Sequence, residues 1–109
     1  MRVSRAQIHT NDDPVCFQFG DTLRIERQES DQADWFWVVG PDERVGWVFR
    51  SYLSGDSGEV TGLRDYDATE LDVQPGDHGE ALEYADGWWL CELSDRRRGW
   101  ILATHVEFS

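Results

Sequence analysis

Residues 34–49, "DWFWVVGPDERVGWVF", have almost the same layout as residues 86–101, "DGWWLCELSDRRRGWI". Each stretch has a run of aromatic and aliphatic residues, then a polar turn, then Gly-Trp followed by further apolar residues. Short apolar runs bounded by Gly, Pro and Asp are typical of β-strands. In residues 21–27, "DTLRIER", apolar and charged residues alternate, which also indicates a strand. No long segment has a helical period, so the sequence predicts an all-β fold.

The similarity extends beyond these stretches and indicates an internal repeat. The spacing between matching positions is 59 near the start of the chain, then 56, then 53. The matches are Val3–Gln7 with Gly62–Tyr66, Phe19–Asp21 with Pro75–Asp77, Trp35 with Trp88, and Trp47 with Trp100. Because the spacing falls by three twice, the second copy has two shorter loops while its strands are kept. The sequence therefore predicts two copies of one small fold.

The predicted boundaries follow from the stretch between the copies. Residues 54–60, "SGDSGEV", are small and polar with two glycines, which is typical of a linker. We predict a first domain at 1–53 and a second at 61–109. Five short strands in about 50 residues predict a small barrel or a tight sandwich in each domain.

The charge limits the kinds of partner. The chain has 22 acidic residues against ten arginines and no lysine, a net charge of −12. This charge repels nucleic acid and favours a partner with a basic segment. No apolar run approaches the roughly 20 residues of a membrane span, and the first residues lack the apolar core of a secretion signal. We expect a soluble, cytoplasmic protein that binds neither nucleic acid nor membrane.

Residue types that carry chemistry are present but are not arranged for it. His9, His78 and His105 have no metal-ligand spacing, and Cys16 and Cys91 do not complete a site. Each cysteine is expected to fill a small buried position on a strand. The sequence has no phosphate-binding glycine loop and no hydrolase or zinc-protease motif. We expect no cofactor, no metal and no enzymatic activity.

The second copy resembles a Src-homology 3 (SH3) domain over its whole length and in the family's order of motifs. The similar stretches are "GLRDYDA" at 62–68, "ELDVQPGD" at 70–77, "ALEYADGWWLCEL" at 81–93 and "RGWILATHVE" at 98–107. The first copy is similar through "VSRAQ", "PVCFQFGD", "DWFW" and "RVGWVFRSYL". The resemblance implies two tandem five-stranded SH3-like barrels.

In that family a shallow aromatic groove holds proline-rich peptides, and a neighbouring acidic loop holds a basic residue of the peptide. The implied groove positions are Arg5, Gln7, Trp35, Phe49 and Tyr52 in the first copy, and Arg64, Tyr66, Trp88, Leu102 and His105 in the second. Each copy keeps two of the family's five side chains. An arginine in place of a groove tyrosine favours carboxylates or carbonyls over proline rings. Both proline-rich recognition and a different protein contact remain open.

The resemblance places the stronger contact site in the second copy. Tyr66 and Trp88 are expected to be neighbours across a groove, with Glu70 holding a cation and Arg64 narrowing the site. Trp35 with Tyr52 forms a weaker site in the first copy. The other loop acids with this expected role are Asp12, Asp13 and Asp72. The expected core residues are Trp47, Trp100, Trp89 and Phe36.

These residues predict a non-catalytic interaction module. Its partner is a protein or peptide, bound through the divergent grooves or a composite surface of both domains. The alternative is a small acidic inhibitor or immunity-type protein that blocks a basic site on an enzyme or nucleic-acid binder. An accessory subunit is a third possibility. The partner's identity and the oligomeric state stay open.

Overall fold

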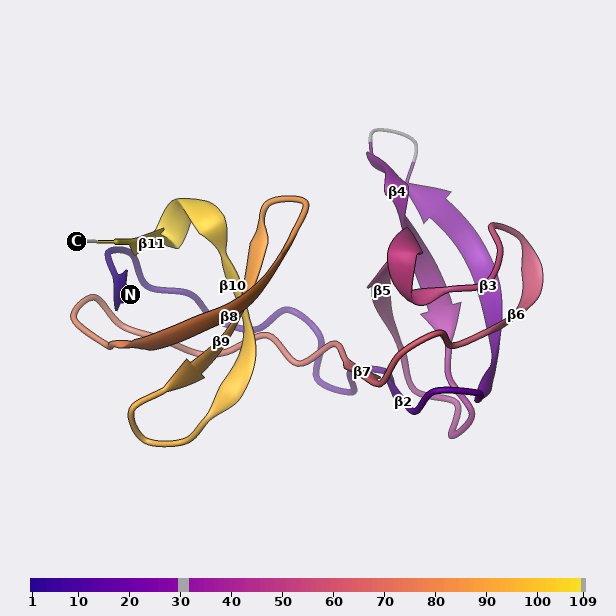
Figure 1. The fold of residues 1–109 in the computed structure, drawn as a ribbon, viewed down its shortest axis with the longest axis horizontal. Helices are drawn as coiled ribbons and strands as arrows, with labels where there is room; N and C mark the ends of the chain where they lie inside the picture. The colour runs from indigo at the N-terminus through magenta and orange to yellow at the C-terminus, as the bar shows by residue number, and fades with distance from the viewer. Residues whose placement is uncertain (30–31, 109) are drawn as a thin grey trace. The chain divides into compact units, whose positions relative to one another are not determined.

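The computed structural model describes residues 1–29 and 32–108, which form β-strands with two short 3-10 helices (Figure 1). The all-β prediction is confirmed. The chain divides into two compact units. Unit 1 contains Met1–Asp12 and Thr69–Ser109, and unit 2 contains Asp13–Ala68. Among the described residues, no helix is long and apolar enough to cross a membrane.

Unit 2 is built on one four-stranded antiparallel sheet with the strand order β5-β4-β3-β6. Its elements are β2 (Cys16–Phe17), β3 (Thr22–Glu29), β4 (Gln32–Val39), β5 (Val45–Phe49), η1 (Arg50–Tyr52), β6 (Gly58–Thr61) and β7 (Tyr66–Asp67). Strands β2 and β7 form a separate antiparallel pair. One face of β4 and β5 presents Phe36, Val38 and Val48, which are fully buried, as the period-two alternation requires.

Unit 1 is built on a three-stranded sheet, β10-β9-β8, with β1 and β11 paired beside it. Its elements are β1 (Arg2–Val3), β8 (Gly79–Ala85), β9 (Trp88–Leu93), β10 (Arg98–Leu102), η2 (Ala103–His105) and β11 (Val106–Glu107). Its buried apolar cluster contains Val3, Leu71, Val73, Cys91, Leu93 and Ile101. Asp86 and Gly87 both have positive φ, which suits the tight turn that joins β8 to β9.

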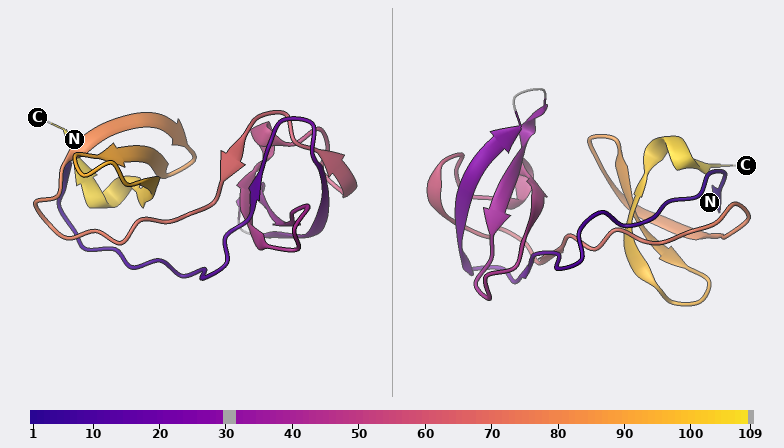
Figure 2. Two further views of the ribbon diagram at one scale, coloured as in Figure 1. Left: turned by 90° about the horizontal axis from the view of Figure 1, so that it is seen from below. Right: turned by 180° about the vertical axis from the view of Figure 1, so that it is seen from behind.

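The predicted domain boundaries do not match these units. Residues 1–12 lie with the second half of the chain, where Val3 pairs with Val106 and Gln7 pairs with Val73. Residues 58–68 lie with the first half, where Val60 pairs with Leu23 and Tyr66 pairs with Phe17. The expected linker at 54–60 ends inside strand β6. Figure 2 shows the indigo start of the chain running within the unit that carries the orange and yellow strands.

The two copies have therefore exchanged their first arms, residues 1–12 and 58–68. Unit 2 is one continuous piece of chain, and it is inserted into unit 1 after Asp12. Each arm pairs through its backbone with strands of the other copy. Because the two arms are similar in sequence, the local sequence pattern does not determine which unit an arm completes. The sheets are small, with two, three, two and four strands among the described residues.

The exchange predicts which fragments fold. A fragment of residues 13–68 retains every strand of unit 2 and should unfold cooperatively in urea. A fragment of residues 1–53, of similar length, lacks β6 and β7 and carries an arm with no partner, so it should show no cooperative transition. Circular dichroism during urea titration measures both. Cooperative unfolding of 1–53 together with a disordered 13–68 would contradict the exchange.

Candidate functional site

The structure divides the predicted site residues between the two units. Arg64, Tyr66, Trp35 and Tyr52 lie in unit 2, whereas Trp88 and Glu70 lie in unit 1. Tyr66 and Trp88, the two residues of the predicted groove, therefore belong to different units.

Tyr66 joins an aromatic cluster in unit 2 that draws on both copies of the repeat. Its ring centroid is 4.7 Å from that of Tyr52 and 5.5 Å from that of Phe17. Its hydroxyl donates a hydrogen bond to the carbonyl oxygen of Trp47 at 2.9 Å. The exchange thus brings the first copy's Tyr52 together with the second copy's Tyr66.

The aromatic groove positions of unit 2 are buried rather than open. The exposed fractions are 6% for Trp35, 2% for Tyr52 and 7% for Tyr66. Trp35 packs on Phe49 with ring centroids 5.3 Å apart. The guanidinium of Arg64 lies 4.6 Å from the centre of the Tyr52 ring, a cation–π contact. These side chains pack on one another, which leaves little aromatic surface for a peptide.

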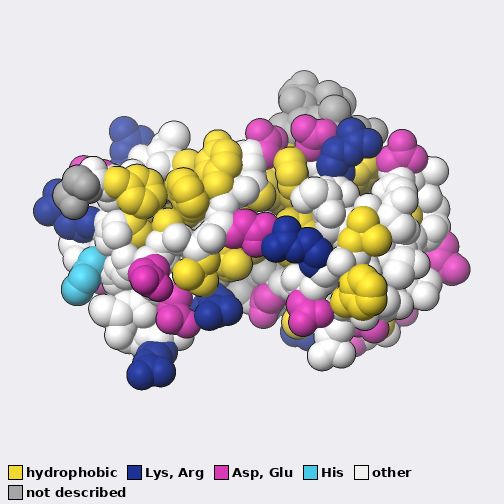
Figure 3. Space-filling model, viewed as in Figure 1, with side chains coloured by type: hydrophobic (Ala, Val, Ile, Leu, Met, Phe, Trp, Pro, Cys, Tyr) yellow, Lys and Arg dark blue, Asp and Glu magenta, His cyan; other side chains and the backbone are white. Residues whose placement is uncertain are grey.

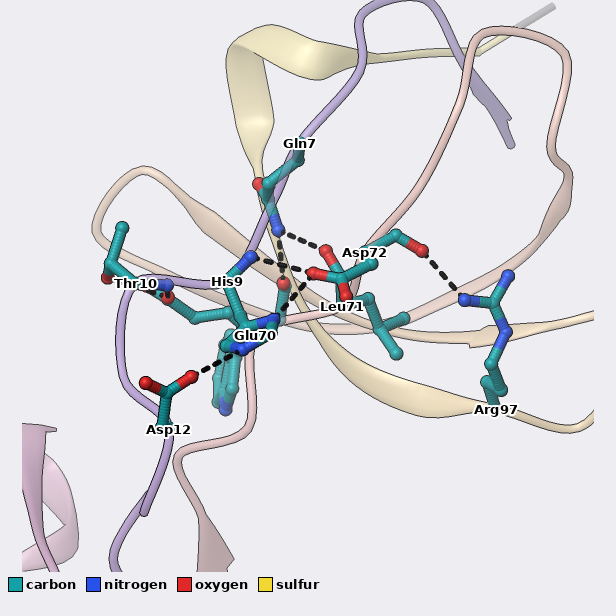
Figure 4. A network of polar contacts seen from close by, with 9 residues as sticks. Gln7, His9, Thr10, Asp12, Glu70, Leu71, Asp72 and Arg97 are labelled. Carbon is teal, nitrogen blue, oxygen red and sulfur yellow. Dashed lines mark hydrogen bonds and ion pairs between the residues drawn. The ribbon is translucent and has the colours of Figure 1, made fainter.

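The loop acids of unit 1 bind the first arm. Glu70 Oε1 accepts hydrogen bonds from the backbone N–H and the hydroxyl of Thr10, at 2.7 and 2.8 Å. Asp72 Oδ1 accepts one from the backbone N–H of His9 at 2.7 Å (Figure 4). Glu70, for which a cation-binding role was predicted, thus fixes the arm through its Oε1.

Four aromatic residues predicted to be structural have different surroundings. Trp100 and Phe36 are buried, as expected, and Trp89 is half-buried against the core cluster of unit 1. Trp47 is half-buried rather than core. Its ring lies 5.1 Å from that of Trp37, and the guanidinium of Arg27 lies over both rings.

Sequence reasoning missed an aromatic ridge on unit 1, formed by Tyr84, Trp89 and Phe108. Trp89 lies between the other two, with ring centroids 5.1 Å from Tyr84 and 5.5 Å from Phe108. Tyr84 is 54% exposed and Phe108 is 57% exposed. Tyr84 and Trp89 are direct cross-strand neighbours on β8 and β9. Figure 3 shows apolar side chains gathered on the unit that carries β8 and β9.

The ridge lies outside the groove positions that the SH3 resemblance implies, which is why it was missed. Trp88, the predicted groove residue of unit 1, is half-buried at the start of β9 opposite Ala85 and Leu102. In the sequence, two features could have indicated the ridge: Tyr84 near the end of an exposed strand, and the aromatic Phe108 one position before the last residue.

Within residues 1–29 and 32–108, no group of three His, Cys, Asp or Glu side chains could hold a metal. Cys91 is buried on β9, and this burial raises the pKa of its thiol to about 11. Cys16 is half-buried, and desolvation raises its pKa as well. Both thiols are therefore poor nucleophiles at neutral pH.

No protein-family model matches this chain, and no curated protein or solved structure matches it significantly.

Replacing Gln7 tests how the arm is held. Its side-chain amide donates to the carbonyl oxygens of Leu71 and Trp100, and its Oε1 accepts from the Leu102 N–H, each at 2.9 Å. Gln7→Ala removes all three hydrogen bonds, although the Trp100 carbonyl oxygen keeps the one from the Leu71 N–H. The substitution should lower the free energy of unfolding by about 2–3 kcal/mol. Gln74→Ala, at an exposed position of the same unit, is the control and should change it by less than about 0.5 kcal/mol. Urea titration of the full chain measures both, and equal effects would contradict the role of Gln7.

Thiol labelling tests the burial of Cys91. In a Cys16→Ser variant at pH 7.5, a thiol-specific reagent should label Cys91 only when the protein unfolds, because both the low thiolate fraction and the burial oppose reaction. The labelling rate should rise with urea in parallel with the unfolded fraction. Rapid labelling of the native variant would show that β9 is open to solvent.

Proposed function

We propose that the protein is a non-catalytic protein–protein interaction module built from two small SH3-like barrels, and that it binds its partner on the aromatic ridge of unit 1. Two compact antiparallel units, each paired with an exchanged arm, support the barrel assignment. The order of the SH3-like motifs along the chain supports the family assignment.

The exposure of the ridge is the observation that carries this proposal. Tyr84 and Phe108 each leave more than half of their surface in water, while Trp89 between them is anchored against the core cluster. An anchored aromatic residue flanked by exposed ones gives a rigid apolar contact surface. Aromatic residues of this kind dominate the binding energy of many protein interfaces.

The charge of the chain indicates the chemistry of the partner. The net charge is −12, and several arginines are held locally by carboxylates, including Arg2 with Glu107 and Arg98 with Glu92. A partner that presents an apolar side chain next to lysine or arginine residues is complementary to such a surface. This chemistry does not require a proline-rich segment.

Substitutions in the ridge test the proposal. Phe108→Ser and Tyr84→Ser remove exposed rings and should leave the fold intact. Loss of an interface hot spot costs about 2 kcal/mol or more, so each variant should bind the partner about thirtyfold more weakly. The partner is captured on the immobilised full-length protein, and its affinity for each variant is then measured by calorimetry.

Phe19→Ser is the matched control, because Phe19 is an exposed aromatic residue of unit 2. It should bind as tightly as the parent protein. Unchanged affinity of both ridge variants, with circular dichroism showing them folded, would place the contact elsewhere.

A second candidate function is the small acidic inhibitor, which the charge favours. In this case the partner is a basic enzyme or nucleic-acid binder, and the contact depends on charge more than on the ridge. Raising the salt concentration from about 50 mM to 500 mM should then weaken binding strongly, because the salt screens exposed charges. Binding through the ridge should change much less over the same range.

A further inference from the structure

His9 lies between two carboxylates at the end of the first arm. Its ring Nδ1 is 2.8 Å from Asp72 Oδ1, and its Nε2 is 2.8 Å from Asp12 Oδ1 (Figure 4). Asp72 follows the buried Leu71 in unit 1, whereas Asp12 is the last residue before the chain enters unit 2. The imidazole therefore connects the body of unit 1 to the point where the chain leaves it.

The protonation state of the ring follows from this geometry. An ionised carboxylate can only accept hydrogen bonds, so each ring nitrogen must donate one. A neutral imidazole has a single N–H and can satisfy only one of the two aspartates. The imidazolium satisfies both and also neutralises one of their two charges.

We propose that His9 is a proton-controlled clasp, which in its imidazolium form fixes residues 9–12 onto unit 1 and on losing its proton releases Asp12. Loss of the proton releases Asp12 but not Asp72, because the two aspartates are held by different contacts. Asp72 keeps the hydrogen bond from the backbone N–H of His9, whichever way the ring is protonated. The side chain of Asp12 is 95% exposed and is free to turn into water.

Two other charged side chains, Arg97 and Glu70, lie near the clasp. Arg97 donates to the carbonyl oxygen of Asp72 at 2.7 Å and adds positive charge on that side. Glu70 accepts both hydrogen bonds of the neighbouring Thr10 through Oε1. His9 is therefore the group whose charge changes near neutral pH, while its partners are carboxylates and a guanidinium.

The direction of the pH dependence follows from the shifted pKa values of His9 and Asp72. The hydrogen bonds with Asp72 and then Asp12 raise the pKa of His9 above its usual 6.5. The stabilisation by the clasp is thus complete below pH 6.5 and is lost as the pH rises through the higher pKa of the folded state. The hydrogen bonds from His9 lower the pKa of Asp72 below 3.8, so acid opens the clasp only below that pH.

The effect of the clasp is limited to the chain crossing. Gln7, two residues before His9, holds the arm through groups that do not titrate near neutral pH: its backbone N–H and C=O pair with Val73, and its amide pairs with unit 1. Loss of the proton should therefore release Asp12 while Thr10 stays bound to Glu70 and β1 stays paired with β11. Such a device regulates the crossing into unit 2 without unfolding unit 1.

The test uses the full-length protein and two measurements at several pH values. The ring proton resonances of His9 give its pKa by NMR, and amide hydrogen exchange of Asp12, corrected for the intrinsic rate, gives the state of the clasp. We expect a His9 pKa above 6.5 and exchange that accelerates as the pH rises through it. The amide of Gln7 should remain protected over the same range.

Two variants and a control complete the test. Asp72→Asn and Asp12→Asn should each lower the His9 pKa, and Asp12→Asn should make the corrected exchange at position 12 independent of pH. Asp56→Asn, in an exposed position of unit 2, should change neither measurement. The proposal would be overturned by a His9 pKa at or below 6.5. It would also be overturned if amide exchange in the parent protein did not change as His9 titrates. Because the Asp12 side chain is exposed, its replacement leaves the protein folded and the outcome interpretable.

Discussion

The docking of Gln7 onto unit 1 is the constraint on which the rest of the structure depends. Its backbone pairs with Val73 in both directions, and its amide satisfies two carbonyl oxygens and one N–H that are otherwise inside the unit. A small β unit cannot leave such groups without partners, since each would cost free energy comparable to a lost hydrogen bond. The first arm therefore has to lie in unit 1, and the chain must then cross into unit 2 and return. The second arm fills the position in unit 2 that the first arm left open.

The exchange makes the two units different although their sequences are so similar. Unit 2 receives Tyr66 from the returning arm and so collects aromatic residues from both copies around Tyr52. These rings pack on one another and on Arg64. Unit 1 receives Gln7 in place of a tyrosine and uses it as a buried polar joint. It is unit 1 that leaves Tyr84 and Phe108 exposed.

The sequence pattern predicted those features of the fold that depend on residues close together in the chain. The all-β class and the burial of Phe36 and Trp100 follow from alternation along each strand. Which arm completes which unit is a choice between two similar segments, and it depends on contacts such as Gln7 with Trp100, 93 positions apart. The surroundings of the candidate site residues also depend on contacts between distant positions. Tyr66 and Trp88 belong to one copy of the repeat but to different units, and His9 meets Asp72 across 63 positions.

In two hairpin turns, an aspartate binds an arginine two residues later in the same turn. In the β4–β5 turn, Asp42 accepts hydrogen bonds from the backbone N–H and the Nε of Arg44, and Asp95 does the same for Arg97 in the β9–β10 turn. The residue between them has positive φ in both turns. In each turn the arginine lowers the pKa of the aspartate. The carboxylate therefore stays ionised, and its hydrogen bonds to the arginine persist, in moderately acidic conditions. Arginines used in this way are not available to balance acids elsewhere, so the excess negative charge stays on the surface. A partner that meets the ridge must then approach through a negative field, and an apolar segment flanked by basic residues does so at the lowest electrostatic cost.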